Sequence, residues 1–292
     1  MKPVNPVVLG RRWAFALLSV ATFAPLAAHA QQNAGPYVPT PNEIVTEMLK
    51  LADVRAGDFL IDLGSGDGRI VITAAERFNA RGFGVDIDGE LVKYANDSAA
   101  RAGVADRVRF ERRDLFQTPL GEATVLTLYL LPHTVTQLVP KILAEMRPGA
   151  RIVSHDYPLS PWTPERHLSM DVAEKVNISG TTRTVLYLYR VPARVGGDWR
   201  LELPETLTRT PARLAIKQES LRVSGRAIVG GTSAPLERLV VQGEQVTFAI
   251  SGLGGRKQAV QFTGKAQGDV IEGTVALPTG AAPWRAVRVA AR

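Results

Sequence analysis

Cysteine is absent from the 292 residues. Disulfide bonds, thiolate nucleophiles and sulfur-ligated metals are therefore excluded, and the fold must rest on core packing. Only four histidines are present, and they are scattered without the spacing of metal ligands, so no metal site is expected. Excess charge of one sign is also small: the net charge of +7 falls to +4 without the three basic residues of the first thirty. The excess is dispersed along the chain, which argues against nucleic acid as a partner.

Long apolar runs are lacking except near the N terminus. There, Lys2, Arg11 and Arg12 precede an apolar run, residues 13–28, which ends in Ala28-His29-Ala30. This pattern predicts a signal peptide, residues 1–30, cleaved after Ala30, and hence an exported protein, periplasmic or secreted. The run is short of the roughly 20 residues that span a bilayer, so a permanent membrane anchor is the weaker interpretation. The arginine pair leaves two export routes open, a twin-arginine signal or an ordinary basic region.

Residues 36–193 alternate between helical and strand patterns, which predicts an α/β domain with a Rossmann-like sheet. Helices are expected over 43–52, 69–78, 90–102 and 134–146, and strands over 59–63, 82–87, 108–112, 125–131 and 150–154. Two further strands, 170–178 and 183–191, are expected as an antiparallel hairpin that turns at Ser179-Gly180. Together these strands give a seven-stranded sheet with a terminal hairpin.

The helical period disappears after Pro192. Short alternating runs separated by turn residues recur about every ten residues, as in 214–216, 221–223, 246–250, 259–262 and 270–275. This spacing predicts a small antiparallel β-barrel or sandwich over residues 198–292, and the segment 194–198 with its Gly196-Gly197 pair is expected to be a linker.

A glycine-rich stretch, Asp62-Leu63-Gly64-Ser65-Gly66-Asp67-Gly68, directly follows the first strand and precedes a helix. Alternate glycines allow a tight turn and a close approach of backbone to ligand, and the helix directs free N–H groups at the site. The spacing is not the G-x-G-x-x-G of dehydrogenases. It resembles the acidic-x-G-x-G-x-G loop of class I methyltransferases. The resemblance implies that Asp62, Gly64, Ser65, Gly66 and Gly68 bind the methionine part of S-adenosylmethionine.

Acidic residues also stand at the end of the second predicted strand and just after the third. Asp86, followed by Ile87, stands where a carboxylate can accept hydrogen bonds from both hydroxyls of a ribose, with Asp88 as the alternative. Asp114 and Leu115 stand where class I methyltransferases contact the adenine edge. These residues complete the predicted cofactor site.

The stretch Pro36-Tyr37-Val38-Pro39-Thr40-Pro41, the loop continued as GSGDGRIV and the segment 158–162 resemble the lysine methyltransferases that modify the c-subunit of ATP synthase, together with their bacterial relatives, over about 155 residues. In that family the stretch before the first helix folds over the cofactor, which assigns Tyr37 and Thr40 to the site. The chain departs from the family in its export signal and its added β domain.

The methyl acceptor is expected beside the fourth strand, at Tyr129-Leu130-Leu131-Pro132. This stretch lacks the Asn/Asp-Pro-Pro-aromatic motif of amide and nucleobase methylation, which disfavours DNA and glutamine as acceptors. Tyr129, His155 and Asp156 are candidate pocket residues, with no catalytic residue assigned, because alignment can supply most of the acceleration of methyl transfer. The sequence predicts a methyltransferase acting on a protein lysine or small amine. The alternative is an exported, non-catalytic protein with a relic Rossmann domain and a ligand-binding β domain.

Overall fold

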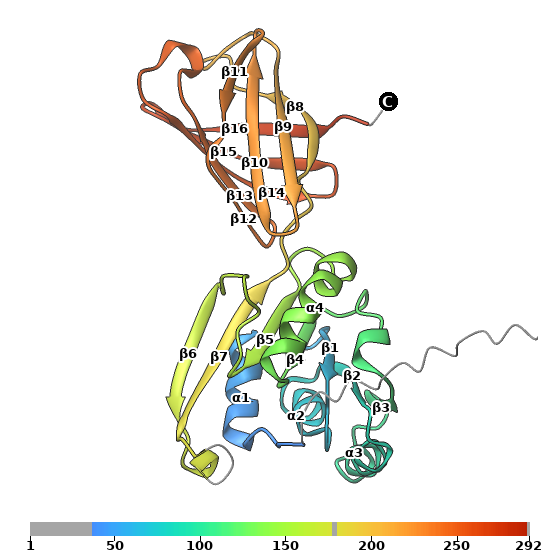
Figure 1. Ribbon diagram of the computed structural model, residues 1–292. Helices are drawn as coiled ribbons and strands as arrows, with labels where there is room; N and C mark the ends of the chain where they lie inside the picture. Colours follow the sequence, from blue (N-terminus) through green and yellow to red (C-terminus); the bar gives the residue numbers. More distant parts are fainter. Residues whose placement is uncertain (1–36, 177–179, 291–292) are drawn as a thin grey trace, which may run out of the picture. The chain divides into compact units, whose positions relative to one another are not determined.

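The computed structural model describes residues 37–176 and 180–290, which form two β-sheets (Figure 1). Each sheet has its own apolar core. The predicted signal peptide, residues 1–30, lies outside the described residues. Within the described ranges, no helix is both long and apolar enough to cross a membrane.

The first sheet has seven strands in the order β3-β2-β1-β4-β5-β7-β6. The first five strands pair in parallel, and β7 is antiparallel to both β5 and β6. The strands are β1 (Phe59–Leu63), β2 (Arg81–Asp86), β3 (Val108–Arg112), β4 (Val125–Leu128), β5 (Arg151–His155), β6 (Arg166–Asp171) and β7 (Arg183–Arg190). This order confirms the predicted Rossmann-like fold with a terminal antiparallel hairpin.

Helices cover both faces of this sheet because each carries one apolar stripe. Residues of α1 (Asn42–Leu51), α2 (Arg69–Phe78) and α3 (Gly89–Arg101) share one buried cluster with one face of the sheet. Residues of α4 (Pro132–Glu145) join the cluster on the other face. Two short 3₁₀ helices complete the domain, η1 (Leu115–Gln117) and η2 (Ala173–Lys175).

The predicted bounds were wrong at two places in the second half of this sheet. The fourth strand ends at Leu128 rather than at 131, because Pro132 begins α4 and has no N–H to donate to a neighbouring strand. The first strand of the hairpin was predicted over 170–178, but β6 ends at Asp171 and the chain turns into η2. Val172 and Lys175 are both buried there although they stand three residues apart, which is the spacing of a helical turn and not of a strand. Residues 177–178 of that prediction lie outside the described residues.

The second sheet has nine strands, and all of its neighbouring strands pair antiparallel. The order is β11-β10-β9-β8-β16-β15-β14-β13-β12, and the sheet curls into a nearly closed barrel (Figure 1). The strands are β8 (Gly197–Glu202), β9 (Ala212–Glu219), β10 (Arg222–Val229), β11 (Thr232–Pro235), β12 (Glu237–Gln242), β13 (Gln245–Ile250), β14 (Val260–Gln267), β15 (Val270–Leu277) and β16 (Gly280–Arg288), with η3 (Leu253–Gly255) between β13 and β14. The predicted all-β fold is confirmed.

Aromatic side chains fill the interior of the second sheet. Phe248 and Phe262 stack with ring centroids 4.8 Å apart, and the Trp284 ring meets both of them edge-on. Trp199 is fully buried in the same cluster. The core of the second sheet is therefore held by side-chain packing, in a chain that has no cysteine to form disulfides.

The segment expected to be a linker is held by the second sheet. Val195 is fully buried in the same cluster as Trp199, and Oε1 of Gln218 accepts hydrogen bonds from the backbone nitrogens of Val195 and Gly196. Strand β8 already begins at Gly197. The segment is therefore part of the β fold, and the domain boundary near residue 193 stays a prediction.

Candidate functional site

The predicted cofactor residues converge at the carboxyl edge of the first sheet. Strands β1, β2, β3, β4 and β5 all end there, and β1 is flanked by β2 and β4, so the order of strands reverses at β1. A crevice outside the carboxyl ends of parallel strands at such a reversal is the usual ligand site of open α/β sheets.

The glycine loop leaves β1 in a conformation that favours glycine. Gly64, Gly66 and Gly68 have φ values of 80°, 53° and 81°. A Cβ atom at Gly66 would overlap with the ring of Tyr37, and one at Gly68 would lie 2.6 Å from Cζ of Phe110. Side chains are thus excluded from the loop by packing as well as by backbone conformation.

Asp62 is a buried carboxylate with no cationic partner among the described residues. It is 2% exposed and accepts a hydrogen bond from the Thr127 hydroxyl at 2.7 Å. Burial, with a further contribution from the nearby negative charges of Asp86 and Asp67, raises the pKa of Asp62 to about 7. No ion pair reaches it from residues 37–176 or 180–290. A cationic ligand would stabilise its ionised form.

Ser65 supplies a second unsatisfied group in the same loop. Its hydroxyl oxygen is buried and has no hydrogen-bond partner among the residues described. Buried polar groups are nearly always hydrogen-bonded, so an orphaned hydroxyl in a loop of this kind points to a missing ligand.

Asp86 and Asp88 accept hydrogen bonds from different parts of the backbone. Asp86 accepts hydrogen bonds from the backbone nitrogens of Gly66, at 2.9 Å, and Asp88, at 3.0 Å, which places its carboxylate beside the glycine loop. Asp88 caps α3, because its carboxylate accepts from the nitrogens of Glu90 and Leu91. The alternative assignment of the ribose contact to Asp88 therefore loses support. Ile87 follows Asp86 and is partly buried at the strand end.

Asp114 and Leu115 lie directly beyond β3. The Asp114 carboxylate accepts a hydrogen bond from the Phe116 nitrogen at 2.8 Å and so caps η1, which begins at Leu115. Leu115 is partly buried against the apolar cluster on the α4 face of the sheet. Their position at the cofactor edge agrees with the predicted adenine contact, which stays a prediction.

The lead-in segment, residues 37–41, lies over the glycine loop. The Tyr37 ring packs on Gly66, and its hydroxyl hydrogen-bonds with Asp67. Arg69 fixes the same segment, since it donates to the Thr40 carbonyl at 2.9 Å while pairing with Asp67 at 2.6 Å. Sequence reasoning missed Arg69. Its place in the first turn of the helix after the loop was the available signal.

The three acceptor-pocket candidates come together at the ends of β4 and β5. The ring of Tyr129 stacks on His155 with centroids 3.9 Å apart, and its hydroxyl hydrogen-bonds with Asp156. His155 is fully buried and contacts Thr40 Oγ1 at 3.3 Å and Thr184 Oγ1 at 2.7 Å. Burial lowers the pKa of His155 to about 4, so the imidazole is neutral.

Two further members of this cluster were missed by sequence reasoning. Lys175, 3% exposed, pairs with Asp156 at 2.6 Å, and the Thr184 hydroxyl donates to the same carboxylate at 2.9 Å. Neither stands in a motif, and only the hairpin geometry brings them to β5. Residues 37–176 and 180–290 contain no group of three or more histidine or acidic side chains placed to hold a metal.

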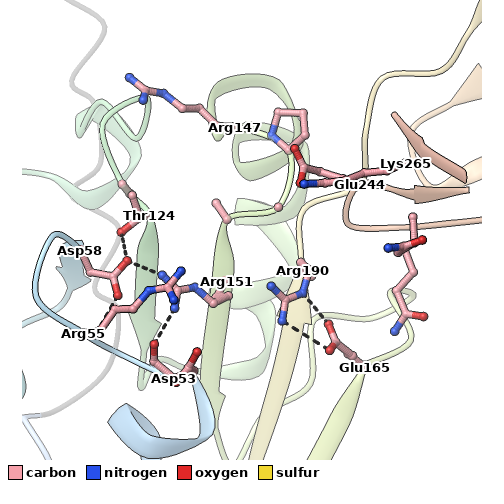
Figure 2. A pocket seen from close by; sticks show the side chains of 16 residues that line it. Asp53, Arg55, Asp58, Thr124, Arg147, Arg151, Glu165, Arg190, Glu244 and Lys265 are labelled. Carbon is pink, nitrogen blue, oxygen red and sulfur yellow. Dashed lines mark hydrogen bonds and ion pairs between the residues drawn. The ribbon is translucent and has the colours of Figure 1, made fainter. Parts of the chain in front are cut away.

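A second polar cluster lies at the opposite edge, where the strands begin (Figure 2). Arg151 forms an ion pair with Asp58 and donates to the carbonyls of Ala52 and Asp53, and Arg190 pairs with Glu165 at 2.9 Å. These arginines bind carboxylates and carbonyls that the fold itself supplies. The cluster connects the end of α1 to β5. Both arginines are paired within the protein, whereas the Ser65 hydroxyl at the cofactor edge has no hydrogen-bond partner among the described residues.

The groups at the cofactor edge fit S-adenosylmethionine. The ligand carries a sulfonium and an ammonium, which suit an unpaired buried carboxylate at Asp62, and its ribose diol suits the remaining lone pairs of Asp86. The glycine loop would bring its backbone close to the ligand, with Tyr37 packed over Gly66. Nothing in the donor set conflicts with this cofactor.

Comparison with known proteins gives a family match within the first sheet. The profile of the ANTKMT methyltransferase domain matches residues 62–166. A protein-lysine N-methyltransferase from Saccharolobus islandicus is 37% identical over 155 residues, which are 53% of this chain and 92% of that protein. The lysine N-methyltransferase of the ATP synthase c-subunit from Xenopus laevis is 36% identical over 152 residues, which cover 51% of this chain and 65% of that protein.

The Mus musculus protein of the same name is 35% identical over 131 residues, which are 44% of this chain, and the match spans about half of that protein, 52%. Among solved structures, an RNA methyltransferase from Salinibacter ruber in complex with S-adenosyl-L-homocysteine is 46% identical. That match covers 54% of this chain and 96% of that chain with a TM-score of 0.49.

Proposed function

The chain belongs to the ANTKMT methyltransferase family, and from this premise we propose that it N-methylates lysine side chains of a protein acceptor. One observation carries the proposal: 155 residues of this chain account for 92% of the length of a relative named as a protein-lysine N-methyltransferase. A second group of relatives is named for lysine methylation of the ATP synthase c-subunit.

The protein is an S-adenosylmethionine-dependent methyltransferase. The cofactor supplies a methyl group made electrophilic by the attached sulfonium. The chain would hold the cofactor through the glycine loop, Asp62 and Asp86. The lead-in segment, which packs over the glycine loop, would keep water away from the bound cofactor. Alignment of the acceptor nitrogen with the methyl carbon then supplies most of the acceleration.

The non-catalytic alternative is not favoured. A relic domain has no need to keep a bare glycine loop, a buried unpaired carboxylate at Asp62 and an orphaned hydroxyl at Ser65, since each costs stability when no ligand binds. The β domain lies outside the residues that the family profile matches, and its ligand is not part of this proposal.

The experiment that tests lysine as the acceptor uses S-adenosylmethionine with a tritiated methyl group. The purified chain is incubated with a protein extract of cells that lack its gene, and separately with total RNA from the same cells. Acid hydrolysis of labelled protein should give N-methylated lysine. Label that appears only in RNA, or only in other amino acids, would contradict the proposal.

Export forms a second, separate proposal. Its support is the basic start, the apolar run of residues 13–28 and the Ala28-His29-Ala30 site in the sequence. The acceptor would then be a protein of the cell envelope or one that the enzyme meets before it crosses the membrane.

A further inference from the structure

Asp156 has little capacity left to bind a substrate amine. Its Oδ1 accepts hydrogen bonds from Lys175 Nζ at 2.8 Å, from the Thr184 hydroxyl at 2.9 Å and from the Val185 nitrogen at 3.1 Å. Its Oδ2 pairs with Lys175 at 2.6 Å, and the Tyr129 hydroxyl also binds this carboxylate. A carboxylate offers about four acceptor sites. Asp156 is therefore saturated by its own fold and is not free to take a proton from an acceptor.

The hydrogen bonds around His155 determine which of its ring nitrogens carries the proton. Burial tends to raise the pKa of Asp156, but the neighbouring His155 and the donors from Lys175, Val185 and Thr184 keep it below its usual range, so it is ionised. The single hydroxyl proton of Thr184 is given to Asp156, so the Thr184 oxygen must accept from Nε2–H of His155. Nδ1 then accepts from Thr40. With both nitrogens used and no exposure, His155 supports its neighbours and does not contact substrate.

Tyr129 is the one candidate of the three that keeps both an open side and unused hydrogen-bonding capacity. Its side chain is partly exposed directly beyond β4, at the cofactor edge. A phenol oxygen that donates its proton can still accept a hydrogen bond. The ring is held by its stack on His155, and the direction of the O–H bond is set by Asp156.

We propose that the Tyr129 hydroxyl oxygen accepts an N–H of the acceptor amine and aims the amine lone pair at the methyl group, while Asp156 and Lys175 are positioning residues that hold this hydroxyl. The assignment rests on the proposed lysine N-methyltransferase function. A buried ion pair is often no more stabilising than apolar packing, so stability alone does not explain the pair of Asp156 and Lys175. A role in holding the Tyr129 hydroxyl does explain it.

The reaction balances without proton transfer to the protein. The neutral amine nitrogen gives its lone pair to the methyl carbon as the carbon–sulfur bond breaks, and the electrons of that bond stay on sulfur. The methylated ammonium then releases one proton to water. Tyr129 keeps its proton throughout, because burial and the negative charge of Asp156 both raise its pKa.

The first test is Tyr129→Phe, which keeps the ring and its stack but removes the oxygen. The initial rate of methyl-lysine formation in the extract, at saturating S-adenosylmethionine, should fall at least about tenfold. The dissociation constant of the cofactor, measured by calorimetry, should stay unchanged. The matched control is Tyr94→Phe, an exposed tyrosine on α3 beside Arg101, which should leave both quantities unchanged.

The second test separates positioning from a merely structural role. Lys175→Met should slow methyl-lysine formation in the wild-type background but add little to the loss already caused by Tyr129→Phe, because both act through one hydroxyl. Lys175→Arg should restore part of the rate. Where Lys175→Met unfolds, Asp156→Asn in the same two backgrounds gives the equivalent comparison.

The outcomes distinguish this assignment from the function on which it rests. If wild type and folded Tyr129→Phe form methyl-lysine at the same rate, the role of Tyr129 is overturned and the proposed lysine methylation is not. Additive losses from Lys175→Met and Tyr129→Phe overturn the positioning role. Absence of methyl-lysine with the wild-type protein overturns the proposed function, and this assignment with it.

Discussion

The backbone nitrogen of Gly66 donates a hydrogen bond of 2.9 Å to Oδ2 of Asp86, which joins the loop after β1 to the end of β2. The bond sets the distance between the bare loop and a carboxylate that keeps further lone pairs at the cofactor edge. The two residues are therefore expected to contribute to one binding site, and replacing each should impair cofactor binding for a different physical reason.

Replacement of Asp86 tests the ribose contact. Asp86→Ala should weaken S-adenosylmethionine binding by about 1.5–3 kcal/mol, because charge-assisted hydrogen bonds to the ribose are lost. Titration calorimetry measures the change. The control Asp88→Ala removes the cap of α3, so it should lower stability by about 1 kcal/mol and leave affinity unchanged. The reverse pattern in folded variants would move the contact to Asp88.

Replacement of Gly66 tests whether the loop must stay bare. Gly66→Val should abolish cofactor binding, because a branched side chain would overlap with the Tyr37 ring and is strained at a φ of 53°. Calorimetry and thermal melting are measured together. Gly103→Ala is the matched control, since Gly103 also has a positive φ, 70°, but a Cβ there meets no atom within 4 Å. Binding by the valine variant with wild-type affinity would show that the loop does not approach the ligand.

The sequence predicted the elements whose signals are local. The predicted and observed bounds agree for strands 59–63 and 108–112 and for helix 69–78. Their apolar periods, with Gly64 after the first of these strands and Gly68 before the helix, define them without help from distant residues. The partner of Asp156 could not be predicted this way. Lys175 lies 19 residues further along the chain, in a run that alternates like a strand, and only the turn after β6 buries it against β5. A lysine in such a run is usually solvated.

The pH dependence of cofactor binding should reveal Asp62. Its folded pKa, about 7, lies above its usual value, so its contribution to stability is present below about pH 4 and is lost as the pH rises through about 7. A cationic ligand binds the ionised form and reverses this preference. Binding should therefore tighten as the pH rises towards 7.

Calorimetry in buffers of different ionisation enthalpy measures the linked proton. About one proton should be released per cofactor bound near about pH 6, and almost none near about pH 8. Asp62→Asn should remove the difference between the two conditions. An equal proton count for the variant and the wild type would assign the linkage to another group.

Export is tested by fractionation of cells that express the full chain. The basic start, the apolar run of residues 13–28 and Ala28-His29-Ala30 form a three-part signal, so the mature protein should be recovered outside the cytoplasm beginning at Gln31. The opposing consideration is that S-adenosylmethionine is made in the cytoplasm. A twin-arginine route would reconcile the two, because that route carries folded proteins and the domain could bind its cofactor before crossing, although it would then perform one turnover unless resupplied.

Replacing both Arg11 and Arg12 by Lys separates the two export routes, because only the twin-arginine route requires the arginine pair itself. Loss of export supports passage of the folded protein, and unchanged export supports the general route. Recovery of the protein in the cytoplasm alone, with Met1 still attached, would contradict export and place catalysis where the cofactor is made.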